Sequence, residues 1–389
     1  MTALSVFWFL YFTGLGVFFP YLTLYLRENA GLSGAQVGVV LATLPLVGLV
    51  AQPFWGNVAD RSGRRSTVLA CVTLGTAAIS LALGHAQSFW GFTVGTAAMA
   101  LCSTAIVPLA LSVSFAALRR HGPHAFGFVR MWGTIGYLAG VALYPLALHR
   151  LAPARADGFE PGLGSLFAVM AAGALAAACL WPWLPRGGAA SVRAQRGEWR
   201  LLLRSGPVVR LIIYTFAGYF FLQGPTALFP LFIRARGGDL STVGRMWMVM
   251  LLLEIPLVAL SGAGLRRFGA RGLLGIGVLA GGVRWLASGL TDNFTALYFL
   301  QLLHGVTVAG LLLGGPLYLE EVVPESLRST AQSLLSTLGV GIGGMLSNAI
   351  GGWLIDAYGI NLPFLAGGLG GIALACAVPW LLPPVERSG

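Results

Sequence analysis

The amino-acid sequence predicts an all-α membrane protein in which twelve transmembrane helices form two pseudo-symmetric six-helix bundles. Hydrophobic residues make up 57% of the 389 residues and charged residues only 10%, whereas about a quarter of a soluble protein is charged. The mean hydropathy is +0.80, so most of the chain must face lipid. Uncharged segments of about 20 residues, long enough to cross a bilayer as a helix, recur along the whole chain.

Twelve segments satisfy this length and composition. We expect them at residues 3–26, 35–56, 66–86, 89–118, 125–148, 163–184, 207–234, 241–263, 271–290, 294–319, 327–353 and 361–382.

The arginines set the expected orientation, since all 24 basic residues are arginine. With the N-terminus inside, 16 arginines fall in cytoplasmic loops and five in outer loops. Because positive charge accumulates in cytoplasmic loops, both termini are expected on the cytoplasmic side of the cytoplasmic (inner) membrane.

The longest segment between spans divides the chain into two halves. We expect an N-terminal six-helix bundle at 1–184, a cytoplasmic linker at 185–206 and a C-terminal six-helix bundle at 207–389. Phe19-Pro20 near the end of the first span recurs as Phe229-Pro230 near the end of the seventh. Parallel six-helix repeats indicate two bundles that rock about a site at the membrane midplane.

Several classes of function are excluded. The four cysteines lie inside apolar runs without metal-ligand spacing, so no metal site is expected. There is no nucleotide-binding Gly-x-x-x-x-Gly-Lys-Ser/Thr loop, and we expect neither an enzyme nor a cofactor. The arginines lie in short loops, which argues against a nucleic-acid partner despite the +11 charge. The expected partners are a small-molecule substrate, protons and the lipid bilayer, and the protein is expected to be a monomer.

A polar decapeptide separates the second and third spans. It reads Gly56-Asn57-Val58-Ala59-Asp60-Arg61-Ser62-Gly63-Arg64-Arg65. This Gly-x-x-x-Asp-Arg-x-Gly-Arg-Arg pattern resembles the signature loop of the major facilitator superfamily, which implies a transporter. Glycines permit the close turn, Asp60 can face a helix N-terminus, and arginines favour the cytoplasmic headgroups. We expect a cytoplasmic gating loop made of Gly56, Asp60, Arg61, Gly63, Arg64 and Arg65.

Four ionisable residues fall inside spans: Arg130, Glu254, Arg284 and His304. A charge at the centre of a span costs at least about 2.5 kcal/mol, so such residues usually face a partner or a wet cavity. Glu254 and Arg284 have opposite signs and could form an ion pair. His304 titrates near neutrality when unperturbed. Together the last three could form a proton relay.

The resemblance extends along nearly the whole chain. Gln52-Pro53, the segment from Arg130 to Tyr137 and the order Glu254, Arg284, His304 look like the lactose permease branch, and Arg284-Trp285 looks closer still to the phenylpropionate-permease-like family. The resemblance implies that Glu254, Arg284 and His304 couple proton movement to transport, and that Arg130 binds substrate. The chain departs from the permease at Thr307, where a Glu is expected, and in having no acidic residue in the fourth span.

Further substrate contacts follow from helical spacing. Thr134 and Tyr137 lie at i+4 and i+7 from Arg130, on one helix face. The remaining candidates are Phe12, Gly16, Phe19, Gln223, Trp247 and Gln301. Ordinary helix packing is the alternative for the aromatic and glycine candidates, Gln223 could instead satisfy backbone groups freed by Pro225, and Arg130 could instead extend to the cytoplasmic interface.

The predicted function is secondary active transport of a small organic solute by alternating access, with proton symport as the predicted mode. An aromatic or other organic acid is the first substrate class, because arginine is a natural carboxylate ligand. The alternatives are a proton-coupled sugar or nucleoside permease, drug efflux, and a non-transporting membrane sensor or assembly factor. Fold alone does not decide among them.

Overall fold

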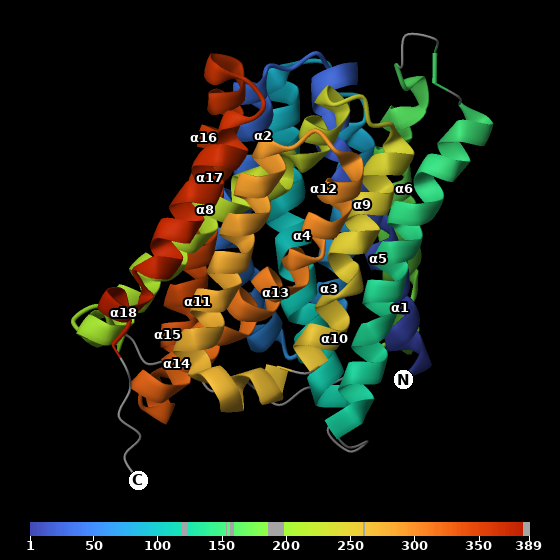
Figure 1. Cartoon of the computed structure of the whole chain (residues 1–389). Helices are drawn as coiled ribbons and strands as arrows, with labels where there is room; N and C mark the ends of the chain where they lie inside the picture. The colour runs from blue at the N-terminus through green and yellow to red at the C-terminus, as the bar shows by residue number, and fades with distance from the viewer. Residues whose placement is uncertain (119–122, 153, 156–158, 186–197, 260, 384–389) are drawn as a thin grey trace. The chain divides into compact units, whose positions relative to one another are not determined.

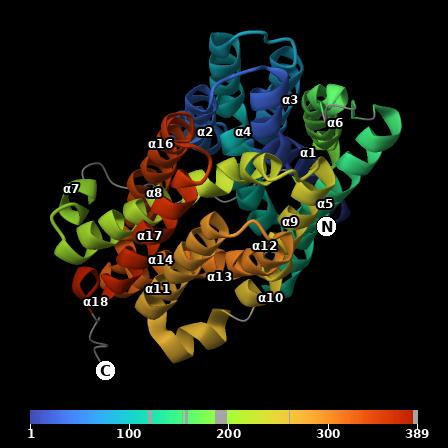
Figure 2. The same cartoon turned by 45° about the horizontal axis from the view of Figure 1, so that its top comes forward.

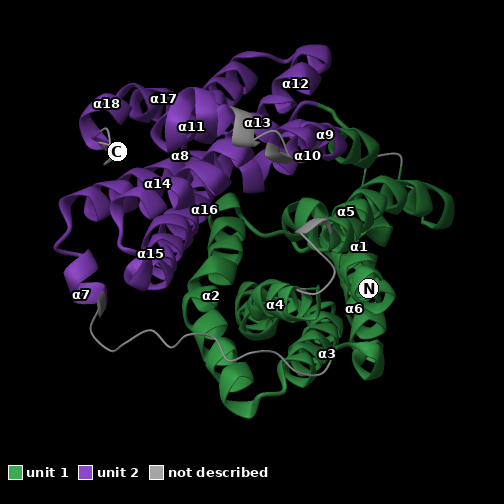
Figure 3. Cartoon of the chain, turned by 90° about the horizontal axis from the view of Figure 1, so that it is seen from below, with its two compact units in different colours: residues 1–192, 237–245 green, residues 193–236, 246–389 purple. Residues whose placement is uncertain are grey.

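The computed structural model describes residues 1–118, 123–152, 154–155, 159–185, 198–259 and 261–383. Within these residues all regular secondary structure is helical (Figure 1). The chain divides into two compact units, coloured separately in Figure 3. Unit 1 comprises residues 1–192 and 237–245, and unit 2 comprises 193–236 and 246–389. The sequence-based division assigns 237–245 to the C-terminal bundle, whereas here it groups with unit 1.

Before the linker, the described residues of unit 1 form six α-helices and three short helical turns. They are α1 (Thr2–Leu24), η1 (Tyr25–Asn29), α2 (Gly34–Ser62), α3 (Arg65–Leu83), α4 (Phe89–Leu118), α5 (Pro123–Leu151), η2 (Pro161–Ser165), α6 (Leu166–Cys179) and η3 (Trp181–Trp183). In this unit α1 packs on α5 and α6, α3 packs on α4 and α6, and α2 packs on α4 (Figure 2).

Glycines allow the backbones of α1 and α5 to touch. A Cβ atom at Gly136 would clash with the carbonyl oxygen of Phe9, and one at Gly140 with that of Thr13. From the other helix, a Cβ atom at Gly16 would clash with the carbonyl oxygen of Tyr137. Small residues at such crossings are typical of membrane helices, where close backbone approach supplies the packing energy.

Unit 2 and the helices leading into it are more interrupted. They are α7 (Glu198–Leu202), α8 (Gly206–Ala235), α9 (Leu240–Leu252, beginning among unit 1 residues), α10 (Glu254–Ala259), α11 (Ser261–Leu290), α12 (Phe294–Gln301), α13 (Leu303–Ala309), η4 (Gly310–Gly314), α14 (Gly315–Val322), η5 (Glu325–Leu327), α15 (Arg328–Leu334), η6 (Leu335–Gly341), α16 (Ile342–Tyr358), α17 (Leu362–Cys376) and α18 (Val378–Leu381). Here α11 packs on α17 and α13, and α8 packs on α16 and α17.

Two further glycine pairs make close contacts in unit 2. Gly310 and Gly314 lie against α11, where a Cβ atom on Gly310 would be 2.6 Å from the carbonyl oxygen of Leu273. Gly339 and Gly343 lie against α8. The Gly-x-x-x-Gly pairs 136/140, 310/314 and 339/343 therefore all lie at helix contacts.

The helices agree with the expected spans in number and order. Among the described residues, ten helical stretches are long and apolar enough to cross a membrane. The shorter apolar helices α9 and α17 fall at the eighth and twelfth expected spans. Two boundaries differ. Helix α2 continues through the polar decapeptide to Ser62, and α11 includes residues expected to form a loop, with non-helical backbone at Gly269 (φ 68°).

Candidate functional site

Arg130 on α5 lies against two neighbouring aromatic rings of α1, whose centroids are 5.3 Å apart. Its guanidinium carbon is 4.7 Å from the ring centroid of Trp8 and 4.6 Å from that of Phe12. Each such cation–π contact is worth about 0.5–2 kcal/mol. Trp8 is fully buried and donates a hydrogen bond from Nε1 to the hydroxyl oxygen of Ser114 on α4, 3.2 Å away. Three helices of unit 1 therefore fix the rings that hold this guanidinium.

Gly133 provides the space that the guanidinium of Arg130 needs beside these two rings. It lies one helical turn after Arg130, and a Cβ atom there would be 2.7 Å from Nη1 of Arg130 and 3.4 Å from both Trp8 and Phe12. A larger residue would push the guanidinium out of its position. The Arg130 cluster is thus Arg130, Trp8, Phe12 and Gly133.

The other predicted substrate ligands of unit 1 differ in how far they are exposed. Thr134 and Tyr137 are half-buried on α5, whereas Phe19 is 46% exposed. Gly16 packs on the backbone of Tyr137, so its visible role is helix packing. Of the predicted residues, Phe12 contacts Arg130.

Unit 2 holds a second, buried arginine. Arg284 on α11 is 1% exposed. Its Nε donates to Oε1 of Gln301 at 2.8 Å, Nη1 lies 2.8 Å from Nδ1 of His304, and Nη2 donates to the sulfur of Met250 at 3.3 Å. The predicted residues Arg284, Gln301 and His304 are therefore brought together as one hydrogen-bonded group.

The partners of Arg284 are all neutral. Its guanidinium carbon also lies 3.7 Å from the ring centroid of Trp285, and Trp285 donates from Nε1 to the carbonyl oxygen of Leu222 on α8 at 3.2 Å. In the described part of the chain, this set of contacts holds Arg284 in place of the ion pair with Glu254 that the opposite charges suggested. Gln301 also donates to the carbonyl oxygen of Leu297 at 3.0 Å, so both ends of its amide are used by the protein.

The remaining candidates of unit 2 lie on α8, α9 and α10. Glu254 is the first residue of α10, directly after the interruption at Leu253, and it is half-buried. Trp247 lies on α9, one turn before Met250. Gln223 on α8 contacts the position where a Cβ atom of Gly344 would lie, with 3.4 Å to Cγ.

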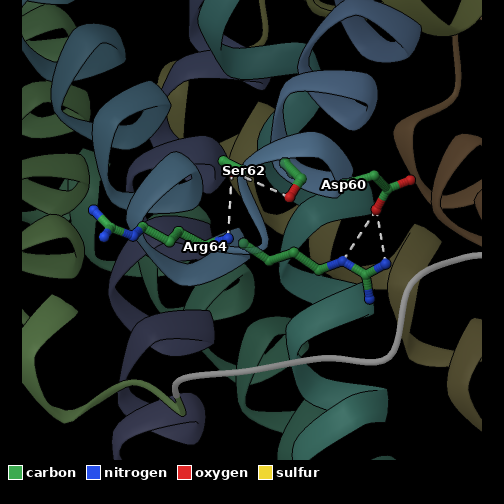
Figure 4. A network of polar contacts seen from close by, with 5 residues as sticks. Asp60, Ser62 and Arg64 are labelled. Carbon is green, nitrogen blue, oxygen red and sulfur yellow. Dashed lines mark hydrogen bonds and ion pairs between the residues drawn. The ribbon is translucent and has the colours of Figure 1, made fainter.

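The polar decapeptide forms the end of α2 and the start of α3. Arg65 donates from Nε and Nη2 to Oδ1 of Asp60, at 3.2 and 2.7 Å (Figure 4). The backbone N–H of Arg64 donates to the hydroxyl of Ser62 at 3.3 Å. Gly63 has φ 64°, a left-handed conformation that suits glycine at a helix C-terminus. The loop itself is therefore only Gly63 and Arg64, while Gly56 and Arg61 belong to α2.

Sequence reasoning missed Trp8, Gly133, Met250 and Trp285 as site residues. Trp8 lies four residues before Phe12, so the aromatic stripe of the first span could have been extended by one turn. Met250 lies four residues before Glu254, on the same helical face. Gly133 lies within the segment 130–137 that carries the permease resemblance, but its spacing did not show that it makes room for a guanidinium. Among the described residues, no group of three or more His, Cys, Asp or Glu side chains could hold a metal ion.

These features define a polytopic helical membrane protein with two internal charged clusters, one in each unit. The chain matches the MFS_1 like family over residues 1–366. It belongs to that family of the major facilitator superfamily and is a secondary transporter of a small organic solute. The expected fold and family are confirmed.

Individual relatives differ in substrate. The chain is 29% identical over 365 residues to a maltose permease of Geobacillus stearothermophilus, covering 94% of this chain and 90% of the permease. It is 28% identical over 317 residues to a probable 3-phenylpropionic acid transporter of Escherichia coli, covering 77% of each protein. The crystal structure of a mutant of the nucleoside transporter NupG superposes with a TM-score of 0.88 at 18% identity, covering 98% of this chain and 99% of the other. At this identity, the structural similarity to NupG shows that the two proteins share a fold.

Proposed function

We propose that this transporter moves a small organic acid, with an aromatic acid as the favoured substrate, and that a proton gradient drives it by symport. Arg130 binds the substrate carboxylate. Glu254, Arg284 and His304 couple the proton to the conformational change.

The observation that supports the acid most directly is the contact of Arg130 with two aromatic rings. The rings of Trp8 and Phe12, at 4.7 and 4.6 Å, restrict the position of the guanidinium. A guanidinium restricted in this way loses little freedom when it forms the two parallel hydrogen bonds of a carboxylate pair. The same rings offer an apolar wall to an aromatic acid. The relative named as a probable 3-phenylpropionic acid transporter agrees with this choice.

Proton coupling is supported by the buried group around Arg284. Its guanidinium, 1% exposed, is bound by neutral partners only, and one of them, His304, can take up a proton. A proton taken up by His304 or Glu254 changes the charge inside unit 2, and so changes the free-energy difference between conformations.

A neutral sugar is the second candidate substrate. The maltose permease match covers 94% of this chain. Thr134 and Tyr137 lie on the same face of α5 as Arg130. Their hydroxyl groups can donate and accept hydrogen bonds, which suits a hydroxyl-rich ligand. An arginine fork can also donate hydrogen bonds to sugar hydroxyls, so Arg130 serves either substrate.

The predicted topology completes the proposal. The N- and C-termini, the linker after Pro185 and the loop at Gly63 lie on the cytoplasmic side of the inner membrane, as the arginine distribution indicates. The protein acts as a monomer, and the polar end of α2 is part of the cytoplasmic gate.

Uptake by purified protein in proteoliposomes tests the proposal. Labelled 3-phenylpropionate, its amide and maltose are compared, each with and without an imposed inward proton gradient. We expect accumulation of the acid only with the gradient, and at least about tenfold weaker inhibition by the amide than by the acid, the loss expected for one charge-assisted hydrogen-bond pair. Equal affinity for acid and amide would reject the organic acid, and gradient-driven maltose accumulation would establish the sugar in its place.

A further inference from the structure

The helical hydrogen-bond pattern between Phe294 and Gly310 is interrupted at one residue, Leu302. Helix α12 ends at Gln301 and α13 begins at Leu303, and the backbone N–H of Leu302 bonds to the carbonyl oxygen of Phe299 at 3.1 Å, a three-residue spacing. Such a tightened turn inside a longer helix often marks a hinge. We call this position the Leu302 joint.

Arg284 contacts both sides of the Leu302 joint. Gln301, the last residue of α12, accepts from Nε at 2.8 Å, and His304, the second residue of α13, lies 2.8 Å from Nη1. Helix α11, which bears Arg284, packs along α13, as Figure 2 shows. One side chain of α11 therefore ties the two segments together.

A second interruption lies against the first. The pattern of α9 and α10 is interrupted at Leu253, and Gly305 on α13 packs on that point. A Cβ atom at Gly305 would be 2.7 Å from the carbonyl carbon of Leu253 and 2.8 Å from the nitrogen of Glu254. Met250, one turn before Leu253, accepts from Nη2 of Arg284 at 3.3 Å. The three side-chain nitrogens of Arg284 therefore all contact residues within one helical turn of Leu302 or Leu253.

The bond to His304 fixes the protonation state of the ring. A guanidinium has only donors, so Nδ1 of His304 must accept, which leaves the proton on Nε2 and the ring neutral. A second proton on Nδ1 would remove the acceptor and place two cations 2.8 Å apart. The bond to Gln301 has no titrating member and survives this change.

Few other charges surround the ring. The elements packed on α13 are α10, α11, α12 and η4. Their titratable groups on described side chains are Glu254, Arg266, Arg267, Arg271, Arg284 and Tyr298. Of these, Arg284 is the group that contacts His304.

We propose that Arg284 is a pin across the Leu302 joint, with Gln301 as its fixed anchor and His304 as its releasable anchor. Protonation of His304 frees α13 from Arg284 while α12 stays attached, so the joint opens. Gln301 is then a positioning residue for Arg284 rather than a substrate ligand. The inference rests on the proposed coupling of transport to protons, and it identifies α13 as the helix that moves.

Spin-label distances test the pin in full-length protein. In a background without Cys71, Cys102, Cys179 and Cys376, cysteines for labelling replace exposed residues. Leu290 at the end of α11 (72% exposed) is the reference, paired in turn with Phe299 on α12 (68%) and Leu312 in η4 (53%). Between about pH 8 and about pH 5, we expect the 290–312 distance to change by about 2 Å or more and the 290–299 distance to stay constant.

Two substitutions at His304 separate the pin from general pH effects. His304→Asn keeps an acceptor near Nδ1 and cannot be protonated, so the 290–312 distance should stay at its high-pH value throughout. His304→Arg introduces a permanent cation, so this distance should take its low-pH value at both pH values. The matched control is His85→Asn, an exposed histidine of unit 1, which should leave the response of the parent unchanged.

Gln301→Leu, which removes the fixed anchor, should change the 290–299 distance. The proposal is overturned if His304→Asn and His304→Arg give the same 290–312 distance at both pH values, or if both label pairs shift together in the parent. Failure of acid uptake with these distance changes intact would instead reject the proposed substrate and leave the pin in place.

Discussion

At the scale of single residues, the arginines of the two clusters differ in what surrounds them. The side-chain nitrogens of Arg284 bond to Gln301, His304 and Met250. The guanidinium of Arg130 lies against the rings of Trp8 and Phe12. A cation flanked by aromatic rings suits an aromatic anion, whereas a cation bonded to a histidine can respond to a proton. This difference is why substrate binding is assigned to Arg130 and conformational coupling to Arg284.

Arg130→Lys should weaken binding of an organic acid about 10- to 100-fold, because lysine keeps the charge but loses the planar fork and the ring stacking. Arg130→Ala should nearly abolish binding. Affinity is measured by inhibition of labelled uptake and by ligand-induced thermal stabilisation. Arg150→Lys, an exposed arginine at the end of the same helix, is the control and should bind normally. Normal acid affinity in Arg130→Lys would remove Arg130 from the site.

Glu254→Gln should abolish accumulation against a gradient while retaining exchange of labelled for unlabelled substrate. Glutamine resembles the protonated carboxyl group, so the variant can bind substrate and change conformation but cannot release a proton. Glu320→Gln, at an exposed carboxylate of α14, is the control. Accumulation equal to that of the parent would make Glu254 structural.

At the scale of secondary-structure elements, glycine contacts determine how closely α1 and α5 approach. Gly136→Ala should destabilise the protein by about 1–3 kcal/mol, because the added methyl group overlaps the backbone of Phe9. Gly127 is the control, since it is on the same helix and has open space around its Cβ position. Gly127→Ala should be neutral or stabilise by up to about 1 kcal/mol. Unfolding in detergent measures the stability of both variants. Equal effects of the two substitutions would contradict the close backbone contact of α1 with α5 at Gly136.

The start of α9 is capped by Asp239. Burial raises the pKa of this carboxyl group, but hydrogen bonds from Thr242 and the charge of Arg245 outweigh it and hold the pKa below its ordinary value. Oδ1 accepts from the backbone N–H and the hydroxyl of Thr242, at 2.7 and 2.6 Å. A carboxyl group with a depressed folded-state pKa stabilises the protein above its unfolded pKa, and this stabilisation is lost as the pH falls through the folded pKa.

Asp239→Ala should therefore cost about 1 kcal/mol near neutral pH, and this cost should begin to fall below about pH 4 and vanish as the pH falls through the lower folded-state pKa. Thermal unfolding of parent and variant at several pH values measures this difference. Asn293→Ala is the matched control, because Asn293 caps α12 with an uncharged amide that accepts from Thr295 and Ala296. Its cost should not depend on pH. A constant cost for Asp239→Ala would show that the charge contributes nothing.

At the scale of the whole molecule, transport requires the protein to alternate between conformations, and the end of α2 is placed to affect that step. Asp60→Asn removes the charge partner of Arg65, and Arg64→Ala removes a cation from the two-residue loop. Both should lower the maximum uptake rate while leaving insertion and substrate affinity nearly normal. Asn57→Ala, exposed on the same helix end, is the control. Tenfold weaker binding with an unchanged maximum rate would contradict a gating role.

The sequence by itself determined the membrane fold, the family and the presence of ionisable residues inside spans at Arg130 and Arg284. Hydropathy, span length and the cost of an intramembrane charge are properties of a segment, so they can be read along the chain. The tertiary structure alone decided which side chains meet: Trp8 with Arg130, Met250 with Arg284, and Gly305 with the interruption at Leu253. Those contacts depend on the rotation and register of packed helices, and helical spacing fixes only which residues share a face.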